Sequence, residues 1–306
     1  MKFLVVGHLC LDVVHPVDGP DVQGYGGIYY SLATLASLLD RTDTVLPVFG
    51  VNKTDYVELL EHLHVFPNID TSGIFKFDEP TNRVHLYYQD AQSRIECSRD
   101  IATPVPYEKI RRRLAVDGIL INMISGSDIT IETLDHIRMT VRSHNIPIHF
   151  DYHSLTLGVD KNHERFRRPL LEWRRWGFML DTVQLNEEEI AGLSTEPMTE
   201  IQTIGHLLTL GIKGVVVTRG ERGATLFYNE HKHVVQKNVD GIPVDNVRDT
   251  TGCGDVFGAA FHIHYVKTHD LLGATQFANH VASNRTRVAG IEGVRALKDI
   301  QIPIES

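Results

Sequence analysis

One ten-residue segment near the carboxyl end combines residue types that can hold and transfer an anionic group. It reads Asp-Thr-Thr-Gly-Cys-Gly-Asp-Val-Phe-Gly over residues 249–258, and an apolar stretch follows it. Glycines directly before a helix let the backbone approach a ligand closely, and the N–H groups of a first helical turn bind anions. The carboxylate of Asp255 would stand beside that site and take a proton from an attacking hydroxyl. The segment therefore predicts phosphoryl transfer, which depends on positioning and charge stabilisation.

Taken alone, the same segment also fits a capped helix start, in which Asp255 is merely favourable near the helix N-terminus. Two other phosphate-binding patterns do not fit. The glycines Gly252, Gly254 and Gly258 follow no strong strand closely, which argues against a dinucleotide-binding turn. The sequence contains no G-x-x-x-x-G-K-[ST], so it is not a P-loop protein.

Further polar groups and glycines stand beside predicted elements. Asn186 follows an apolar run and has Glu189 three residues later, which is close to a helix capping box. Residues 218–223 follow Val-Val-Val and fit an ordinary hairpin turn or a nucleotide contact. Gly26 and Gly27 precede a predicted helix, so their backbone could meet a ligand closely.

Short strands and amphipathic helices must position these residues. The strands are continuous apolar runs rather than alternating ones, as expected for a covered parallel sheet, and the class is α/β. The predicted strands are Lys2–Gly7, Thr44–Gly50, Gly118–Ile124, Ile146–Asp151, Met179–Leu185 and Gly214–Thr218, and helices are predicted at Ile131–Ser143, Ile201–Leu210 and Leu271–Val288.

The segment Ser72–Ser98 does not follow this alternation of buried strands and helices. Val84, Leu86 and Tyr88 alternate with polar or amphipathic neighbours, which is typical of an antiparallel strand with one wet face. We expect residues 73–77, 82–88 and 94–97 to form one inserted β element. Such an element is a lid, a dimer contact or a β meander at the sheet edge.

Composition restricts the class of protein further. The chain has 306 residues, enough for one large α/β domain or two smaller ones, and a net charge of −9 from 30 basic and 39 acidic residues. An acidic chain lacks the electrostatic character of a nucleic-acid binder. The cysteines Cys10, Cys97 and Cys253 form no disulfide or zinc pattern, and the first apolar run is too short for a signal peptide. We expect a cytoplasmic protein with no membrane segment.

The motif Asp-Thr-Thr-Gly-Cys-Gly-Asp resembles the signature of the ribokinase/PfkB family of carbohydrate and nucleoside kinases, usually D-T-x-G-A-G-D, with Cys253 in place of alanine. The resemblance extends to the family's N-x-x-E at 186–189, its nucleotide-binding strand, loop and strand at 215–227, its glycine pair at 26–27, and its early G-x4-D at Gly7 and Asp12. It implies a single three-layer α/β/α domain over 1–306, mainly parallel, with a small β lid around 72–98 and part of 8–25. It also implies ATP, Mg²⁺ and an alcohol acceptor.

The resemblance implies a role for each matching residue. Asp255 would be the catalytic base, and Gly252, Cys253 and Gly254 the anion hole. Asp249 would shape the loop or lie near a metal. The nucleotide would contact Asn186, Glu189, Thr218, Gly220, Gly223 and Asn279. Its hydrated Mg²⁺ would lie near Glu189, without a dedicated protein metal cage. The acceptor would meet Asp12, Gly26, Gly27 and Ser31. Many family members respond to a monovalent cation, for which we assign no ligands here.

The acceptor is the least specified part of this prediction. Ser31 stands where ribokinase has an asparagine that grips sugar hydroxyls, which argues against a ribokinase in the strict sense. Tyr29, Tyr30, His8 and His153 offer flat surfaces for a nucleobase, although each also fits the core or the lid. The balance slightly favours a nucleoside over a free sugar or a sugar acid.

Two functions from other classes compete with the kinase. A ligand-binding or regulatory protein could keep this fold without turnover, but the retained Asp255 and paired glycines argue against it. The sequence also argues against a nicotinamide dehydrogenase, because it lacks the glycine fingerprint of that class. The family resemblance further suggests a homodimer built through the lid.

Overall fold

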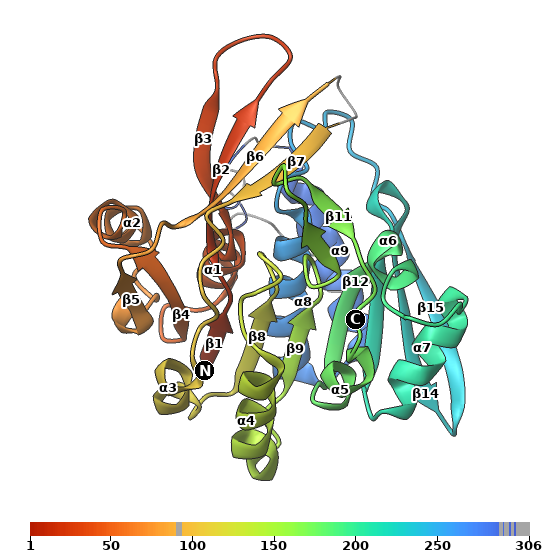
Figure 1. The fold of residues 1–306 in the computed structure, drawn as a ribbon. Helices are drawn as coiled ribbons and strands as arrows, with labels where there is room; N and C mark the ends of the chain where they lie inside the picture. Colours follow the sequence, from red (N-terminus) through yellow and green to blue (C-terminus); the bar gives the residue numbers. More distant parts are fainter. Residues whose placement is uncertain (90–93, 288–289, 291–293, 295–296, 298–306) are drawn as a thin grey trace.

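A nine-stranded sheet forms the centre of the molecule (Figure 1). The computed structural model describes residues 1–89, 94–287, 290, 294 and 297. The strand order is β15-β14-β13-β12-β9-β8-β1-β4-β5, and neighbours are parallel except β13–β14 and β14–β15. The strands are β1 (Lys2–Val6), β4 (Thr44–Asn52), β5 (Ile74–Phe77), β8 (Gly118–Asn122), β9 (Ile148–Asp151), β12 (Thr182–Asn186), β13 (Gly214–Thr218), β14 (Gly223–Glu230) and β15 (His233–Asp240).

Helices cover both faces of this sheet, so the architecture is α/β/α (Figure 1). Side chains of β1 alternate between two cores, with Phe3 and Val5 in one and Leu4 and Val6 in the other, and all four are fully buried. One layer contains α1 (Ile28–Leu38), α2 (Tyr56–Leu63), α8 (Cys253–Thr268) and α9 (Leu271–Arg285). The other contains α3 (Tyr107–Ile110), α4 (Ile131–Val141), α5 (Trp173–Phe178), α6 (Glu187–Ala191) and α7 (Glu200–Thr209). Residue 288, predicted in the last helix, lies outside the described residues.

A separate four-stranded sheet, which we call the lid, has the order β3-β2-β6-β7. Its strands are β2 (Leu9–His15), β3 (Val22–Gly27), β6 (Asn82–Tyr88) and β7 (Arg94–Arg99). The lid continues directly from the end of β1, because β2 begins three residues after it. The prediction for Gly73–Phe77 is wrong in one respect. The strand β5 is not part of the lid, because it pairs in parallel with β4 at the edge of the main sheet.

A short hairpin of β10 (Leu157–Val159) and β11 (Arg165–Arg167) connects the body to the lid. The N–H of Ser98 in β7 donates to the carbonyl of His163 (2.8 Å), and Cys97 forms an isolated antiparallel bridge with Glu164. The hairpin is therefore held against the outer strand of the lid.

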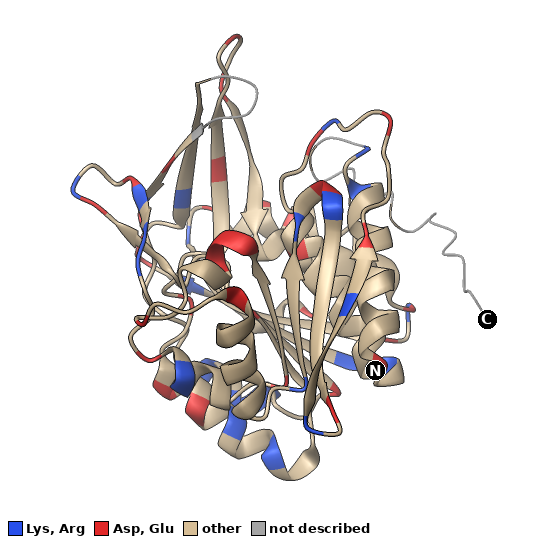
Figure 2. Ribbon diagram, turned by 90° about the vertical axis from the view of Figure 1, so that its right-hand side faces the viewer, with Lys and Arg blue, Asp and Glu red and all other residues tan. Residues whose placement is uncertain are grey.

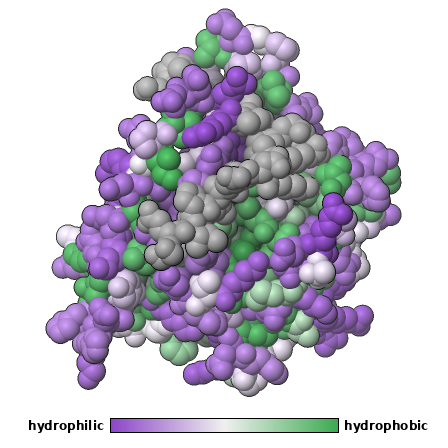
Figure 3. Space-filling view, turned by 180° about the vertical axis from the view of Figure 1, so that it is seen from behind, coloured by the Kyte–Doolittle hydropathy of each residue, from purple (hydrophilic) through white to green (hydrophobic). Residues whose placement is uncertain are grey.

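Acidic and basic residues are interspersed along the chain (Figure 2). Seen from behind, groups of hydrophobic side chains lie among hydrophilic ones (Figure 3). Within the described residues, no helix is both long and apolar enough to span a bilayer.

Candidate active site

A cavity of about 690 Å³ lies where the lid meets the body. Its walls come from the lid, from the segments that follow β9, β12 and β13, and from the first turn of α8. Open α/β sheets bind their ligands at this edge, outside the carboxyl ends of the strands. The sequence predicts site residues on several of these elements, and the fold brings them to one place.

A second cavity of about 1140 Å³ shares Asp12, Tyr30 and Thr251 with the first. Its other walls are largely apolar and aromatic and include Val22 and Tyr25. Asp255 lines the smaller cavity together with the other buried carboxylates described below, so the smaller cavity is where chemistry can occur.

The start of α8 depends on a glycine. Gly252 is the residue before the helix and has φ +75°, a left-handed conformation that favours glycine. A Cβ there would lie 2.5 Å from the ring of Tyr30, so no side chain fits. The amide of Cys253 donates to the carbonyl of Thr250 (3.2 Å), whereas Gly254 continues into the first helical turn. First-turn amides have no partner within their own helix and can face an anion.

The loop before α8 is fastened by a buried ion pair. Asp249 accepts from the guanidinium of Arg285 (2.9 Å), which is fully buried, and from the N–H groups of Thr251 (2.8 Å) and Gly290 (2.9 Å). Of the two roles predicted for Asp249, this placement corresponds to shaping the loop.

Asp255 is buried at the wall of the cavity, with 5 % of its surface exposed. Burial is the main cause that raises its pKa to about 7, and the charges of Asp12 and Glu189 add to this effect. The Nδ2 of Asn122 donates to Asp255 Oδ1 (3.1 Å) and opposes the increase. A carboxyl with a pKa near 7 is matched to accepting a proton from an alcohol at neutral pH.

Two more buried acids face the same space. Burial, and then the charges of Glu189 and Asp255, raise the pKa of Asp151 well above its usual value, and burial raises the pKa of Glu189 to about 7. The ligand atoms of Asp151, His153 and Asp255 all lie within 4.8 Å of one another. Carboxylate oxygens are preferred partners of Mg²⁺, and a cation would relieve the repulsion among the acids. The donor set therefore fits a divalent cation.

Glu189 is itself tied to the start of α6 by a full capping box. The amide of Glu189 donates to Asn186 Oδ1, the amide of Asn186 donates to Glu189 Oε2, and Asn186 Nδ2 donates to Glu189 Oε1, each at 2.8 Å. The local prediction of a capping box is confirmed. Because both carboxylate oxygens already accept hydrogen bonds, Glu189 can reach a cation only with remaining lone pairs or through water.

The residues predicted to contact the nucleotide divide into two groups. Thr218 and Gly220 line the cavity. Gly223 is instead required by the β13–β14 turn, because it has φ +91° and a Cβ there would lie 2.1 Å from the carbonyl of Val239. Asn279 is buried and its Nδ2 donates to the carbonyl of Asp240 (2.9 Å), which ties α9 to β15.

Of the residues predicted to contact the acceptor, some line the cavity and others do not. Asp12 of the lid and Gly27 line the cavity. Gly26 leaves space for the carboxylate of Asp12, because a Cβ at Gly26 would lie 2.0 Å from it. Ser31 is fully buried in α1 and its hydroxyl donates to the backbone carbonyl of Asp255 (3.5 Å), so it faces the core.

The flat residues that favoured a nucleoside lie mostly in the core. Tyr29 is 1 % exposed and its hydroxyl donates to the carbonyl of His62 (3.3 Å). His8 is equally buried and bonds Ser125 Oγ through Nδ1 (2.9 Å). Tyr30 lies over Gly252, and only its cavity-facing surface is available to a ligand.

The sequence prediction does not include Asp151, Arg165 and Gln184, which line this cavity, or Asn122, which is buried behind it. It proposes His153 only as a flat surface. Asp151 and Asn122 are the last residues of β9 and β8, so their position at the carboxyl ends of buried strands was a usable signal. Arg165 gives no such signal, because only the pairing of its hairpin with the lid brings it to the cavity.

Residues 174–292 match the model of the pfkB family carbohydrate kinases. A ribokinase of Arabidopsis thaliana is 35 % identical over 115 residues, 36 % of this chain and 30 % of that protein. A candidate sugar kinase of Pyrococcus horikoshii is 26 % identical over 300 residues, 93 % of this chain and 90 % of that protein.

The fold is also shared with a solved structure of Arabidopsis thaliana ribokinase complexed with ribose and ATP. The TM-score is 0.72 at 19 % identity, over 98 % of this chain and 99 % of that one. The matching segment contains the glycine turn and Asp255 at the start of α8. The carboxyl-terminal part of the chain is therefore similar to the pfkB family carbohydrate kinases, and the chain as a whole shares the fold of the solved ribokinase.

Proposed function

We propose that this protein transfers the γ-phosphoryl group of ATP to a hydroxyl of a sugar-type acceptor, a class that includes nucleosides. The observation that supports it most directly is Asp255, a buried carboxyl with a pKa near 7 that lines the same cavity as the glycine turn of α8. In this role Asp255 takes the proton of the acceptor hydroxyl as its oxygen attacks. The first-turn amides of α8 face the transferring phosphoryl oxygens.

The other residues of the cavity position the two substrates. Asp12 accepts hydrogen bonds from acceptor hydroxyls, and Thr218 and Gly220 lie on the side of the nucleotide. Mg²⁺ bound to the phosphates would neutralise negative charge during transfer. Asp151 and Glu189 would hold it directly or through water, since both are buried acids with raised pKa values. Asn122 holds Asp255 and Asp151 in place through one amide group.

The first test replaces Asp255 by asparagine and measures ADP release from ATP–Mg²⁺ with a panel of pentoses, hexoses, sugar acids and nucleosides. Loss of a catalytic base typically lowers the rate by roughly 10²–10⁴-fold. We therefore expect kcat to fall by about that factor in Asp255→Asn, with the KM for the acceptor changed only a few-fold.

The control is Asp40→Asn, an exposed residue outside the cavity, which should leave kcat unchanged. An acceptor-dependent signal that survives in Asp255→Asn would refute the assignment of the base. A wild-type protein that binds ATP and acceptor but forms no ADP would instead be a binding protein on this fold.

A further inference from the structure

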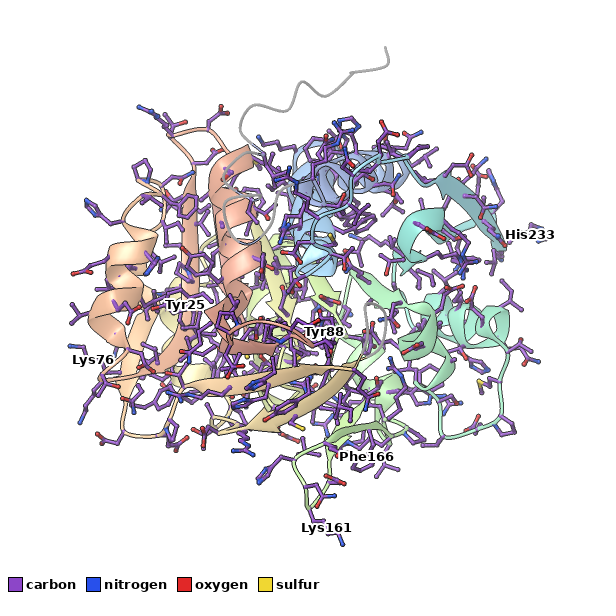
Figure 4. All side chains as sticks on the ribbon, turned by 90° about the horizontal axis from the view of Figure 1, so that it is seen from above. Tyr25, Lys76, Tyr88, Lys161, Phe166 and His233 are labelled. Atoms are coloured by element: carbon purple, nitrogen blue, oxygen red, sulfur yellow. The ribbon has the colours of Figure 1, made fainter. Side chains whose placement is uncertain are left out.

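Arg165 is a charged cavity residue to which the proposed reaction gives no role. It lies in β11, on the hairpin that joins the body to the lid. Figure 4 shows this hairpin, labelled at Lys161 and Phe166, beside the lid strands. The side chain of Arg165 lines the cavity that contains Asp255.

The partners of Arg165 distinguish it from the other arginines of the cavity. Arg167 pairs with Glu188, and Arg219 pairs with Glu187 (2.8 Å) and Glu200. Among the described residues, by contrast, Arg165 forms no ion pair with a carboxylate.

Within the described part of the chain, Arg165 donates its hydrogen bonds to neutral oxygens. Its Nε donates to Ser98 Oγ in the lid, one terminal nitrogen donates to Ser154 Oγ, and the other lies 3.5 Å from the carbonyl of Ile124. These contacts fix the guanidinium between the lid and the body and leave N–H groups on both terminal nitrogens for another acceptor. A partly buried guanidinium with no paired carboxylate can therefore bind an anionic ligand group.

The charges of the other two cavity arginines, Arg167 and Arg219, are already paired with carboxylates. The cavity is otherwise rich in acids, including Asp12, Glu96 and Asp255. An anionic group on the acceptor would therefore be repelled by these acids and attracted by Arg165, which would fix its orientation.

Arg165 and the proposed base border the same cavity. A terminal nitrogen of Arg165 donates to the hydroxyl of Ser154, the residue after His153, and a ring nitrogen of His153 lies within 4.8 Å of carboxylate oxygens of Asp151 and Asp255. A ligand in this cavity is therefore bordered by both the cationic group and the proposed base.

Given the proposed phosphotransferase activity, on which this inference rests, we infer that Arg165 selects an acceptor that carries an anionic group. The acceptor is a polyhydroxy compound with a carboxylate or a phosphate at the end remote from the reacting hydroxyl. Arg165 binds that group with paired N–H donors, which suit the geometry of both anions. Asp12 receives the hydroxyls between the two ends.

The test compares neutral sugars with their acidic counterparts: glucose with gluconate and glucose 6-phosphate, and ribose with ribonate and ribose 5-phosphate. ADP release is measured for wild type, Arg165→Gln, Arg165→Lys and, as the control, Lys161→Gln, an exposed charge on the same hairpin. Binding of the same compounds is measured in parallel by calorimetry with a non-hydrolysable ATP analogue. The carboxylate and phosphate arms identify which anion is recognised.

We expect wild type to prefer an acidic compound at least tenfold over its neutral counterpart. A lost charged hydrogen bond corresponds to roughly 10–100-fold in affinity. Arg165→Gln should therefore raise the KM for the acidic acceptor by about that factor, leave kcat within a few-fold, and leave the neutral sugar unchanged. Arg165→Lys should be intermediate, and Lys161→Gln should match wild type.

A merely structural Arg165 would weaken acidic and neutral acceptors alike, and that result would overturn the inference. A wild type that prefers neutral sugars would overturn it too, while the proposed kinase activity would stand. If acidic compounds bind in an Arg165-dependent manner without ADP release, the ligand class stands and the proposed activity fails. If none of the acidic compounds binds, the inference is wrong.

Discussion

One buried amide side chain lies between two of the carboxylates at this cavity. Asn122 is fully buried, and its Nδ2 lies 3.1 Å from Asp255 Oδ1 and 3.4 Å from Asp151 Oδ2. Burial drives the pKa values of both acids upward, and this shared donor opposes the increase for Asp255. Because Glu189 also interacts with Asp151 and Asp255, the apparent pKa values belong to the cluster rather than to one residue.

The pH dependence of catalysis follows from this arrangement. In the proposed reaction Asp255 must be deprotonated to accept the hydroxyl proton, and its pKa is raised to about 7. As the pH falls below about 7, kcat/KM should therefore fall about tenfold per pH unit. In Asn122→Ala the loss of the hydrogen bond raises the pKa of Asp255 further, so the acidic limb of the profile should move to higher pH.

The measurement is kcat/KM for the acceptor between about pH 5 and 9 for both proteins. Asn162→Ala, an exposed position on the β10–β11 hairpin, serves as the control and should reproduce the wild-type profile. A limb that stays in place or moves to lower pH in Asn122→Ala would exclude this role of the amide.

At the scale of elements, the turn into α8 is the least replaceable connection in the site. Gly252 combines φ +75° with a ring of Tyr30 that occupies the space of a Cβ. Gly220 has a similar conformation, φ +60°, but open space around it. Alanine substitutions at these two glycines therefore distinguish the cost of backbone strain from the cost of steric overlap.

We expect Gly220→Ala to lower the free energy of unfolding by about 1–2 kcal/mol, the strain of a left-handed alanine. Gly252→Ala should lower it by about 2–4 kcal/mol, because displacement of Tyr30 is added to that strain. Urea unfolding of the two variants and the wild type measures the difference. Equal losses in the two variants would show that Tyr30 moves aside freely.

Features that depend on neighbouring residues could be predicted from the sequence, and features that depend on distant residues could not. The α6 capping box, the glycine turn and the alternation of buried strands and helices depend on neighbouring residues, and the structure contains all three. The parallel pairing of β2 with β6 and of β4 with β5 depends on partners far along the chain. For this reason β5 was predicted in the wrong sheet, and Arg165, which the lid pairing delivers, was not found.

At the scale of the whole molecule, two sheets meet over one cavity. The lid contributes Asp12 and Glu96, and the body contributes Asp255 and the carboxyl ends of β8, β9 and β12. Substrate that contacts both sheets would hold them together and exclude water from the phosphoryl group, which limits wasteful ATP hydrolysis.

Hydrogen exchange of the lid tests this coupling. Amides of β2, β3 and β6 should exchange more slowly when acceptor and a non-hydrolysable ATP analogue are both present, because closure removes local opening. Amides of α4, on the far part of the body, provide the internal reference and should not change. Unchanged exchange in the lid with both ligands bound would argue against closure.

Cys253, the one departure from the usual motif, has a consequence for redox chemistry. Burial is the main cause that raises the pKa of its thiol to about 11, and its Sγ lies 3.9 Å from the carbonyl of Ala282. Burial also raises the pKa values of Cys10 and Cys97. Since the thiolate is the reactive species, all three sulfurs should react more slowly at neutral pH than an exposed cysteine would. A thiol placed in the turn before α8 therefore makes the proposed active site less sensitive to oxidants and alkylating agents than an exposed thiol there would.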